Sequence, residues 1–477
     1  MRINDRELMW AGLAALVVGL ATNDWLASAS LLTVLICVKL TWTGDGLFVL
    51  PLAVAFHWME TSLGVFYNGF TGRTLNTIEL SDYRPMVLIG LGCCLALAAG
   101  VRIGLTLKKA PDPSVPRPGF AFSFGLLLAV YVVTVFSQGL LATIGPDYPS
   151  LRQIITTFDS ARLGVLFLIL RRFCAPPPRF GLVALIVSIE IVLGITGFFA
   201  GFREPIVLAV LAVLEIFDRQ SNRHWMALAA ASVVIMALGV LWMGIRTEYR
   251  AEYVEVDQFS GSRSTRIKRV GDLTSNFLKN DSGSVWNTAD SLVDRMWTVY
   301  YPALAIVRVP AVLPHTDGAI LSAAVTHLVT PRVFFPNKGE LPSDSDMVRK
   351  YSGVYVAGRE VNTTIAFGYS AEAFIDFGVP LMFVPVFAFG VFAGFCYTLF
   401  RSLIWHRDLF VSFATVSFWI SLYLFERSWA TMLGVTLGFM VYLGAPMVLL
   451  DRLLLIRFTA QQSRGDTELL FTTAREP

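Results

Sequence analysis

Charged residues gather between positions 331 and 378, a stretch flanked by long apolar segments. The cations and carboxylates there are Arg332, Lys338, Asp344, Asp346, Arg349, Lys350, Arg359 and Glu372. A guanidinium group can bind phosphate oxygens through two hydrogen bonds and stays charged in a partly dry site, and a carboxylate can take a proton from a hydroxyl group. This stretch is therefore the part of the chain best suited to handling a polar ligand.

Residue type separates the candidate bases from the candidate anion-binding residues. Glu372, Asp344 and His327 are the candidate bases. The candidate anion-binding cations are Arg203, Arg246, Arg295, Arg332, Lys338 and Arg359. Structural alternatives remain open, because Arg203 could cap the helix that follows it and Glu372 could pair with Arg332 or Arg359. A single histidine on an apolar helix face, such as His327, is also commonly a packing residue.

Composition places these residues in an integral membrane protein. Hydrophobic residues make up 55% of the 477 residues, charged residues make up 15%, and the mean hydropathy is +0.62. The formal net charge of +3 gives no basic signature over the whole chain, so no nucleic acid partner is expected. The five cysteines show neither CxxC spacing nor a place in the large polar segment, so we predict no disulfide and no metal site.

Apolar runs of about the length needed to cross a bilayer predict an all-α, polytopic protein with about 12 transmembrane helices. The runs lie near residues 8–22, 25–42, 46–64, 85–107, 119–141, 152–170, 180–200, 205–218, 225–244, 379–400, 409–425 and 430–450. Short clusters of arginine and lysine between them fall on one side, which predicts that this side and both termini are cytoplasmic.

This topology divides the chain into four predicted parts. Residues 1–244 form an N-terminal bundle of about nine spans, and residues 245–378 form a large extracytoplasmic loop with amphipathic or re-entrant helices before the last three spans. Residues 379–457 hold the C-terminal spans and residues 458–477 a cytoplasmic tail. Within the large loop we expect a polar loop over 245–283, an amphipathic helix over 285–309, a short apolar helix over 319–328 and a return toward the membrane over 363–377.

A series of short motifs in the predicted outer segment resembles a known family. The motifs are Asp294-Arg295, Pro331-Arg332, Pro336-Asn337-Lys338, Ser343-Asp344, Gly368-Tyr369-Ser370-Ala371-Glu372 and Phe377-Gly378. In this order they are similar to the Wzy-type repeat-unit polymerases of O-antigen and exopolysaccharide synthesis. The flanking helices agree with that family mainly in number and in the large outer loop.

The resemblance implies a polymerase in the bacterial inner membrane, with undecaprenyl-diphosphate-linked oligosaccharide as substrate. A flippase, a chain-length regulator and membrane lipid would be its partners, and no cofactor or metal is implied. The expected catalytic residues are Glu372, Arg332 and Asp344, and the expected substrate-binding residues are Arg203, Arg246, Arg295, Lys338, Arg359 and His327. A glycan ligase shares the helix bundle and the outer loop and remains open. A lipid-linked glycan flippase also remains open, although the chain shows no internal duplication.

Overall fold

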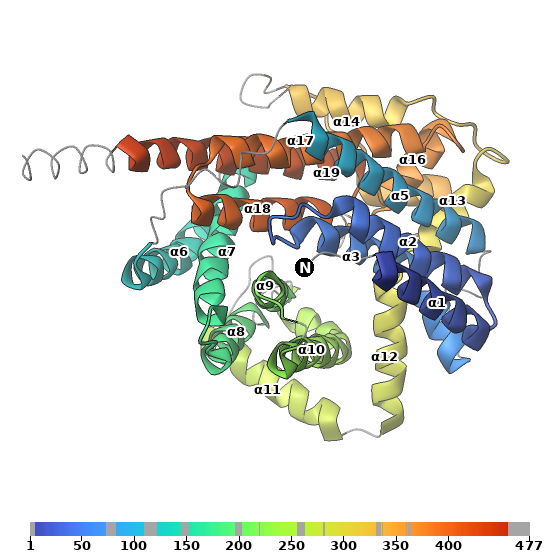
Figure 1. The fold of residues 1–477 in the computed structure, drawn as a ribbon. Helices are drawn as coiled ribbons and strands as arrows, with labels where there is room; N and C mark the ends of the chain where they lie inside the picture. The colour runs from blue at the N-terminus through green and yellow to red at the C-terminus, as the bar shows by residue number, and fades with distance from the viewer. Residues whose placement is uncertain are drawn as a thin grey trace, which may run out of the picture.

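All regular secondary structure in the described part of the chain is helical (Figure 1). The computed structural model describes residues 5–72, 83–108, 122–144, 152–195, 203–218, 220–254, 263–279, 282–330, 335, 337–358, 360 and 364–456. The all-α class expected from the sequence is therefore confirmed for these residues.

Each of the twelve predicted spans coincides with a helix. The first nine are α1 (Asp5–Thr22), α2 (Trp25–Thr41), α3 (Val49–Thr71), α5 (Arg84–Leu107), α6 (Phe124–Ile144), α7 (Arg152–Cys174), α8 (Phe180–Ile195), α9 (Arg203–Glu215) and α10 (Asn222–Val254). The last three are α17 (Phe383–Leu403), α18 (Arg407–Leu422) and α19 (Trp429–Gly438), which continues through the π-helical η4 (Phe439–Gly444).

Six helices among the described residues are long and apolar enough to cross a membrane. They cover Val49–Thr71, Arg84–Leu107, Gln153–Cys174, Asn222–Ala251, Phe383–Leu403 and Trp429–Ile456. Within the described residues, shorter apolar helices cover Gly12–Thr22, Trp25–Thr41, Phe124–Phe136 and Phe180–Gly194, which lie in four further predicted spans. The architecture therefore suits a membrane-embedded protein, and a total of twelve spans stays a prediction.

Glycines let α5 and α17 approach each other unusually closely. A Cβ atom at Gly100 would lie 2.2 Å from the carbonyl oxygen of Phe387, and one at Gly394 would lie 2.2 Å from that of Val101. Gly104 and Gly390 meet the facing backbone in the same way. Small residues spaced four apart on both helices allow such backbone contact, which is a common way to pair apolar helices where the hydrophobic effect gives little driving force.

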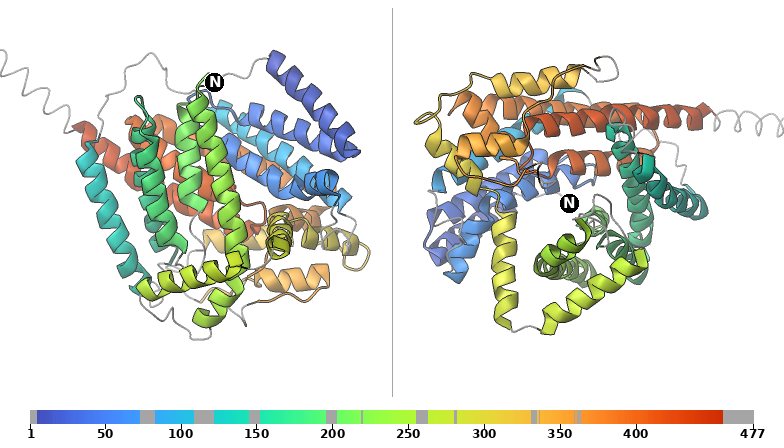
Figure 2. Two further views of the ribbon diagram at one scale, coloured as in Figure 1. Left: turned by 90° about the horizontal axis from the view of Figure 1, so that it is seen from below. Right: turned by 180° about the vertical axis from the view of Figure 1, so that it is seen from behind.

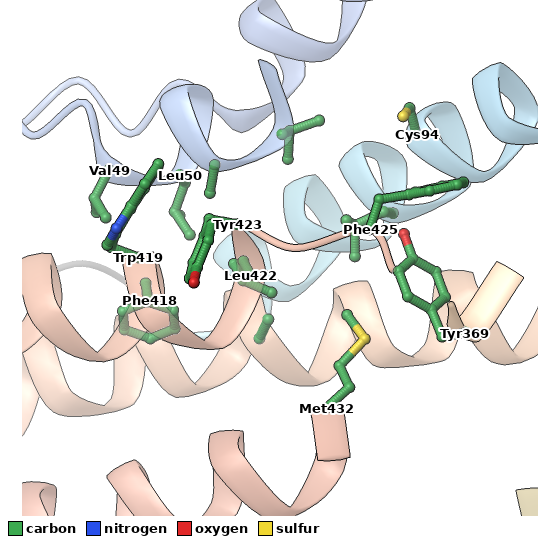
Figure 3. Packing of buried hydrophobic residues seen from close by; sticks show 14 of the residues in the cluster. Val49, Leu50, Cys94, Tyr369, Phe418, Trp419, Leu422, Tyr423, Phe425 and Met432 are labelled. Atoms are coloured by element: carbon green, nitrogen blue, oxygen red, sulfur yellow. The ribbon is translucent and has the colours of Figure 1, made fainter. Parts of the chain in front are cut away.

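The core is centred on α18, whose residues 409–419 are all buried. Its end carries Trp419 and Tyr423, whose rings stack with centroids 4.9 Å apart. Figure 3 shows both rings facing Val49 and Leu50 of α3. The stacked rings therefore fix the position at which the chain segment after α18 begins.

The structure corrects the loop predicted over residues 245–283. α10 runs through residue 245 to Val254, and α11 (Arg263–Lys279) is a further helix. Val270, Leu273 and Phe277 recur at helical spacing and belong to one buried cluster with Trp242 and Tyr249 of α10. The sequence pattern of α11 looks polar because only this narrow apolar face is needed to bind it to α10.

The amphipathic helix predicted over 285–309 is two helices, α12 (Ser282–Met296) and α13 (Tyr300–Arg308). The break is held by α3: the Trp297 indole donates to the carbonyl of Thr61 at 2.8 Å, and the Thr298 N–H donates to that of Glu60 at 3.1 Å. The short helix predicted over 319–328 is confirmed as α14 (Ala319–Val329). Two further short helices follow it, α15 (Asp344–Ser352) and α16 (Tyr369–Phe377).

Candidate functional site

A cavity of about 690 Å³ lies between α14, α15, α16 and the start of α19. We call it the carboxylate cavity. Its titratable lining residues are His327, Glu340, Asp344, Lys350, Tyr351 and Glu372. The three candidate bases of the sequence, which are 17 and 28 positions apart along the chain, thus line one cavity.

Glu372 is almost completely buried at the wall of this cavity, with 4% of its surface exposed. One carboxylate oxygen accepts a hydrogen bond from the backbone N–H of Trp429 at 2.7 Å. Burial raises the pKa of Glu372 to about 8, and the nearby carboxylates of Asp344 and Asp376 add to the shift, while the Trp429 N–H opposes it. The side chain is therefore mostly protonated at neutral pH and becomes a strong proton acceptor when it ionises.

The first turn of α16 explains the glycine of the motif that precedes Glu372. Gly368 adopts a φ of 93°, and a Cβ atom there would lie 2.4 Å from the carbonyl oxygen of Phe425. Only glycine fits this close approach between the start of α16 and the α18–α19 connection. The contact places Glu372 beside Trp429.

Asp376, one helical turn beyond Glu372, has a structural role. Its carboxylate accepts the N–H groups of Ile320 at 3.0 Å and Leu321 at 2.8 Å, in the first turn of α14. These groups have no partner within their own helix, so Asp376 caps α14 from a different element. Asp376 therefore fixes the start of α14, whereas Glu372 faces the cavity.

Lys338 and His327 are linked at the other end of α14. The Lys338 ammonium group donates to the carbonyls of His327 at 2.6 Å and Thr330 at 2.8 Å, near the C-terminus of the helix. Both residues line a second cavity of about 790 Å³ next to the carboxylate cavity. Lys338 thus holds the end of α14 and lies close to the predicted site.

A separate cavity of about 290 Å³ holds two of the predicted anion-binding residues, Arg246 of α10 and Arg295 of α12. We call it the arginine cavity. The carboxylates of Asp294 and Glu426 and the phenol rings of Tyr300 and Tyr301 also line it. Arg295 forms an ion pair with Glu426 at 3.1 Å, with 58% of the arginine side chain exposed. Among the residues that the structure describes, Arg246 forms no ion pair.

Arg203 lies at the start of α9 and interacts with the end of α18. Its guanidinium group donates to the Tyr423 hydroxyl at 2.6 Å and pairs with Glu204 at 3.1 Å. It also lies 4.5 Å from the centroid of the Tyr423 ring, and the guanidinium of Arg427 lies 5.1 Å from the same centroid. Arg203 and Arg427 therefore sit on one aromatic ring, and Arg203 does not line either cavity.

The two cavities lie back to back across two short chain segments. Thr364 lines the carboxylate cavity, whereas Ile365 and Ala366, which follow it, line the arginine cavity. Likewise Glu426 lines the arginine cavity and Ser428 the carboxylate cavity. Two residues of extended chain span at most about 7 Å, so the wall between the cavities is only one segment thick.

Glu60 is a buried carboxylate that the sequence analysis did not select. It accepts the N–H of Phe425 at 2.7 Å, while its backbone carbonyl accepts the N–H of Thr298. Glu60 thus holds two walls of the arginine cavity, the segment at Thr298 and the α18–α19 connection. The signal that could have identified it is the single carboxylate within the predicted span 46–64, because such a charge is costly in a membrane and needs a purpose.

Two predicted site residues, Arg332 and Arg359, lie outside the described residues. The other seven fall into three groups. Glu372, Asp344 and His327 line the carboxylate cavity, and Arg246 and Arg295 line the arginine cavity. Lys338 follows α14 and binds its C-terminal end beside the carboxylate cavity, and Arg203 lies at the start of α9 on the ring of Tyr423, away from the lining of both cavities.

Comparison with known proteins gives the family of the chain. Residues 104–403 match the family described as "Domain of unknown function (DUF8712)", and this match covers more than half of the sequence, so the chain belongs to that family. No curated protein and no solved structure matches it.

Proposed function

We propose that this protein is a polymerase of lipid-linked oligosaccharide repeat units, which transfers a glycan from undecaprenyl diphosphate to the next unit. The observation that supports this best is the pair of adjacent cavities with different chemistry. One presents two arginines that suit a diphosphate, beside the carboxylates of Asp294 and Glu426, and the other presents a buried carboxylate that suits proton transfer from a sugar hydroxyl. In this proposal the donor and the acceptor meet where the thin wall at residues 364–366 and 426–428 separates the cavities, because the transfer needs both functions close to the reacting atoms.

In this proposal the acceptor hydroxyl oxygen attacks the anomeric carbon of the donor sugar. The bond from that carbon to the diphosphate oxygen breaks, and the diphosphate leaves with the electron pair. Glu372 takes the hydroxyl proton, with Asp344 and His327 beside it in the cavity. Arg246 and Arg295 neutralise the charge that develops on the diphosphate. Arg332 remains a predicted catalytic residue, and Arg359, Lys338 and Arg203 remain predicted contributors to substrate binding.

The proposed setting is the bacterial inner membrane, with about 12 spans, both termini in the cytoplasm and the cavities on the outer side. The cavities lie toward one end of the bundle, since Glu426 and Ser428, in the connection between α18 and α19, line them. The positive residues that predict the cytoplasmic side, such as Arg171, Arg401 and Arg407, lie at the other ends of α7, α17 and α18. A flippase that supplies the units and a chain-length regulator are the expected partners, with no cofactor or metal required.

The test is the polysaccharide profile of cells that lack the gene and carry wild-type protein, Arg246→Ala or Arg295→Ala at matched membrane levels. We expect both variants to lose long polymer and to accumulate single lipid-linked units on the outer face. The matched control is Arg223→Ala, because Arg223 is an exposed arginine at the opposite end of α10.

Other outcomes of this test separate the alternatives. Units that accumulate on the inner face would favour a flippase. Polymer of normal length that fails to reach its final lipid acceptor would favour a ligase. Normal polymer in both variants would contradict the assignment of the arginine cavity.

A further inference from the structure

Helix α11 lies crosswise at the end of α10, as Figure 2 shows. α10 contains one of the candidate spans, Asn222–Ala251, and α11 begins twelve residues after that span ends. The buried face of α11 is formed by Val270, Leu273 and Phe277, which pack on α10. A helix that runs across the end of a membrane span is positioned at the level of the lipid headgroups.

The rest of the α11 surface divides into an apolar and a polar flank. Around the helix axis, with Ile267 at 0° and about 100° per residue, Leu278, Gly271 and the half-buried Thr274 lie within roughly 40° of Ile267, whereas the buried face lies at roughly 240–300°. Ile267 is 43% exposed and Leu278 is 69% exposed. The exposed polar residues Lys268, Asp272, Asn276 and Lys279 fall at roughly 100–180° on the same scale.

The charge of α11 indicates what contacts these flanks. Its sequence holds the five basic residues Arg263, Arg266, Lys268, Arg269 and Lys279 against the single acid Asp272. Trp286, at the adjacent α12, is 61% exposed, and exposed tryptophan is typical of the membrane interface. A basic helix with one apolar flank and one polar flank has the chemistry of a surface that lies in an anionic lipid interface.

We propose that α11 is an interfacial helix that binds the anionic phospholipid headgroups of the bilayer, with Ile267 and Leu278 among the acyl chains and Lys268 and Lys279 at the phosphates. α11 is then a lipid contact that fixes the depth of the α10–α12 region. This contact is independent of the chemistry proposed for the two cavities.

The first test measures depth in the full-length protein. The five native cysteines are buried, so a nitroxide label can be directed to a single introduced thiol at Leu278→Cys, Ile267→Cys or Asn276→Cys. In lipid nanodiscs, we expect the labels at 278 and 267 to be relaxed more by oxygen than by a water-soluble nickel complex, and the label at 276 to show the reverse. A label at 278 that is as accessible to nickel as the label at 276 would overturn the proposal.

The second test measures lipid preference. A bimane at Leu278→Cys should be quenched more by brominated phosphatidylglycerol than by brominated phosphatidylcholine at equal mole fraction, by about fivefold, as expected for a lysine near an anionic surface. The preference should disappear in the added Lys268→Gln and Lys279→Gln variant. Equal quenching by the two lipids would contradict binding to anionic lipid. If the label at position 278 is shielded from the water-soluble nickel complex in native membranes but not in lipid nanodiscs, α11 binds another protein instead.

Discussion

At one end of the bundle Arg171 donates to both Glu215 and Asp408 at 2.7 Å, whereas at the other end Arg203 and Arg427 share the ring of Tyr423. The first end continues with the pairs of Arg407 with Glu215 at 3.1 Å and Arg401 with Asp45 at 3.2 Å. We call these pairs the charge network. α9 separates the two ends, because its 13 residues from Arg203 to Glu215 rise about 18 Å.

The difference lies in how each guanidinium group is satisfied. In the charge network, carboxylates on α9, α18 and the segment before α3 match the arginines directly, and Glu215 is only 6% exposed. In the arginine cavity, the exposed Arg295 has one partner, the half-buried Glu426, and Arg246 forms no ion pair with the residues described. Matched charges hold helices together, and guanidinium groups that line a cavity remain available for an anionic ligand.

The largest effect is expected at Glu372. Glu372→Gln keeps an oxygen that can accept the Trp429 N–H and removes the proton acceptor. Activity on purified lipid-linked repeat units should fall by about 10²- to 10⁴-fold, the usual contribution of a general base, while thermal stability is retained. Asp376→Asn is the contrasting variant, since both carboxylate oxygens of Asp376 accept N–H groups of α14 and the amide keeps only one acceptor, so stability should fall. Full activity of Glu372→Gln would exclude Glu372 as the base.

In the charge network, in contrast to Glu372, we expect a substitution to lower stability. Arg171→Ala leaves Glu215 and Asp408 with fewer partners, so we expect a loss of about 2–3 kcal/mol in the free energy of unfolding, less than for a fully buried pair. Unfolding in mixed detergent micelles measures this loss. The control is Arg172→Ala, a neighbouring exposed arginine, for which a change of about 0.5 kcal/mol or less is expected. If Arg171→Ala is as stable as Arg172→Ala, the ion pairs of the charge network do not stabilise the fold, and the proposed difference between the two ends of the bundle is wrong.

The sequence predicted the helices well where an apolar run alone decides the structure. The run 85–107 matches Arg84–Leu107, because a backbone in an apolar environment must satisfy its own hydrogen bonds. The run 245–283 failed because the three apolar residues of α11 form a face that only α10 reveals. The break after Met296 was also missed, since the Thr61 carbonyl of α3 that binds Trp297 lies 236 residues away in the sequence.

For the candidate site, residue type in the sequence identified several residues that line cavities, but the sequence did not show which residues bind each other. Charge and position selected Glu372, Asp344 and Arg246, which do line cavities. Glu60 could not be paired with its partner, because the N–H it binds belongs to Phe425, 365 residues away. The division into two cavities depends on the segments at 364–366 and 426–428, and no local pattern specifies how these meet.

The pH dependence should distinguish catalysis at Glu372 from the structural charges. The pKa of Glu372 is raised to about 8, so the ionised, proton-accepting form is scarce at pH 7 and predominant at pH 9. The rate under subsaturating substrate should therefore rise about tenfold between these values. The same shift means that folding takes up a proton between the ordinary pKa of 4.5 and about 8, so the contribution of Glu372 to stability falls as pH rises through that window. A flat rate profile would contradict the role of Glu372 as base.

The smallest expected effect compares one substitution at both ends of the bundle. Glu426→Gln removes the half-buried partner of Arg295, and because Arg295 itself is largely exposed, the free energy of unfolding should change by less than about 1 kcal/mol. Binding of a short-chain polyprenyl diphosphate should tighten by about 2- to 5-fold and become more sensitive to salt, because the carboxylate no longer competes for Arg295.

Glu215→Gln removes the same charge from a buried residue that accepts from both Arg171 and Arg407. It should therefore lower stability more than Glu426→Gln and leave binding of the diphosphate unchanged. Together the two variants test whether Glu426 competes with the ligand for Arg295, whereas Glu215 stabilises the fold. Weaker binding in Glu426→Gln would show that the carboxylate positions Arg295 for the ligand, and the contrast between the two ends would then rest on Arg246 alone.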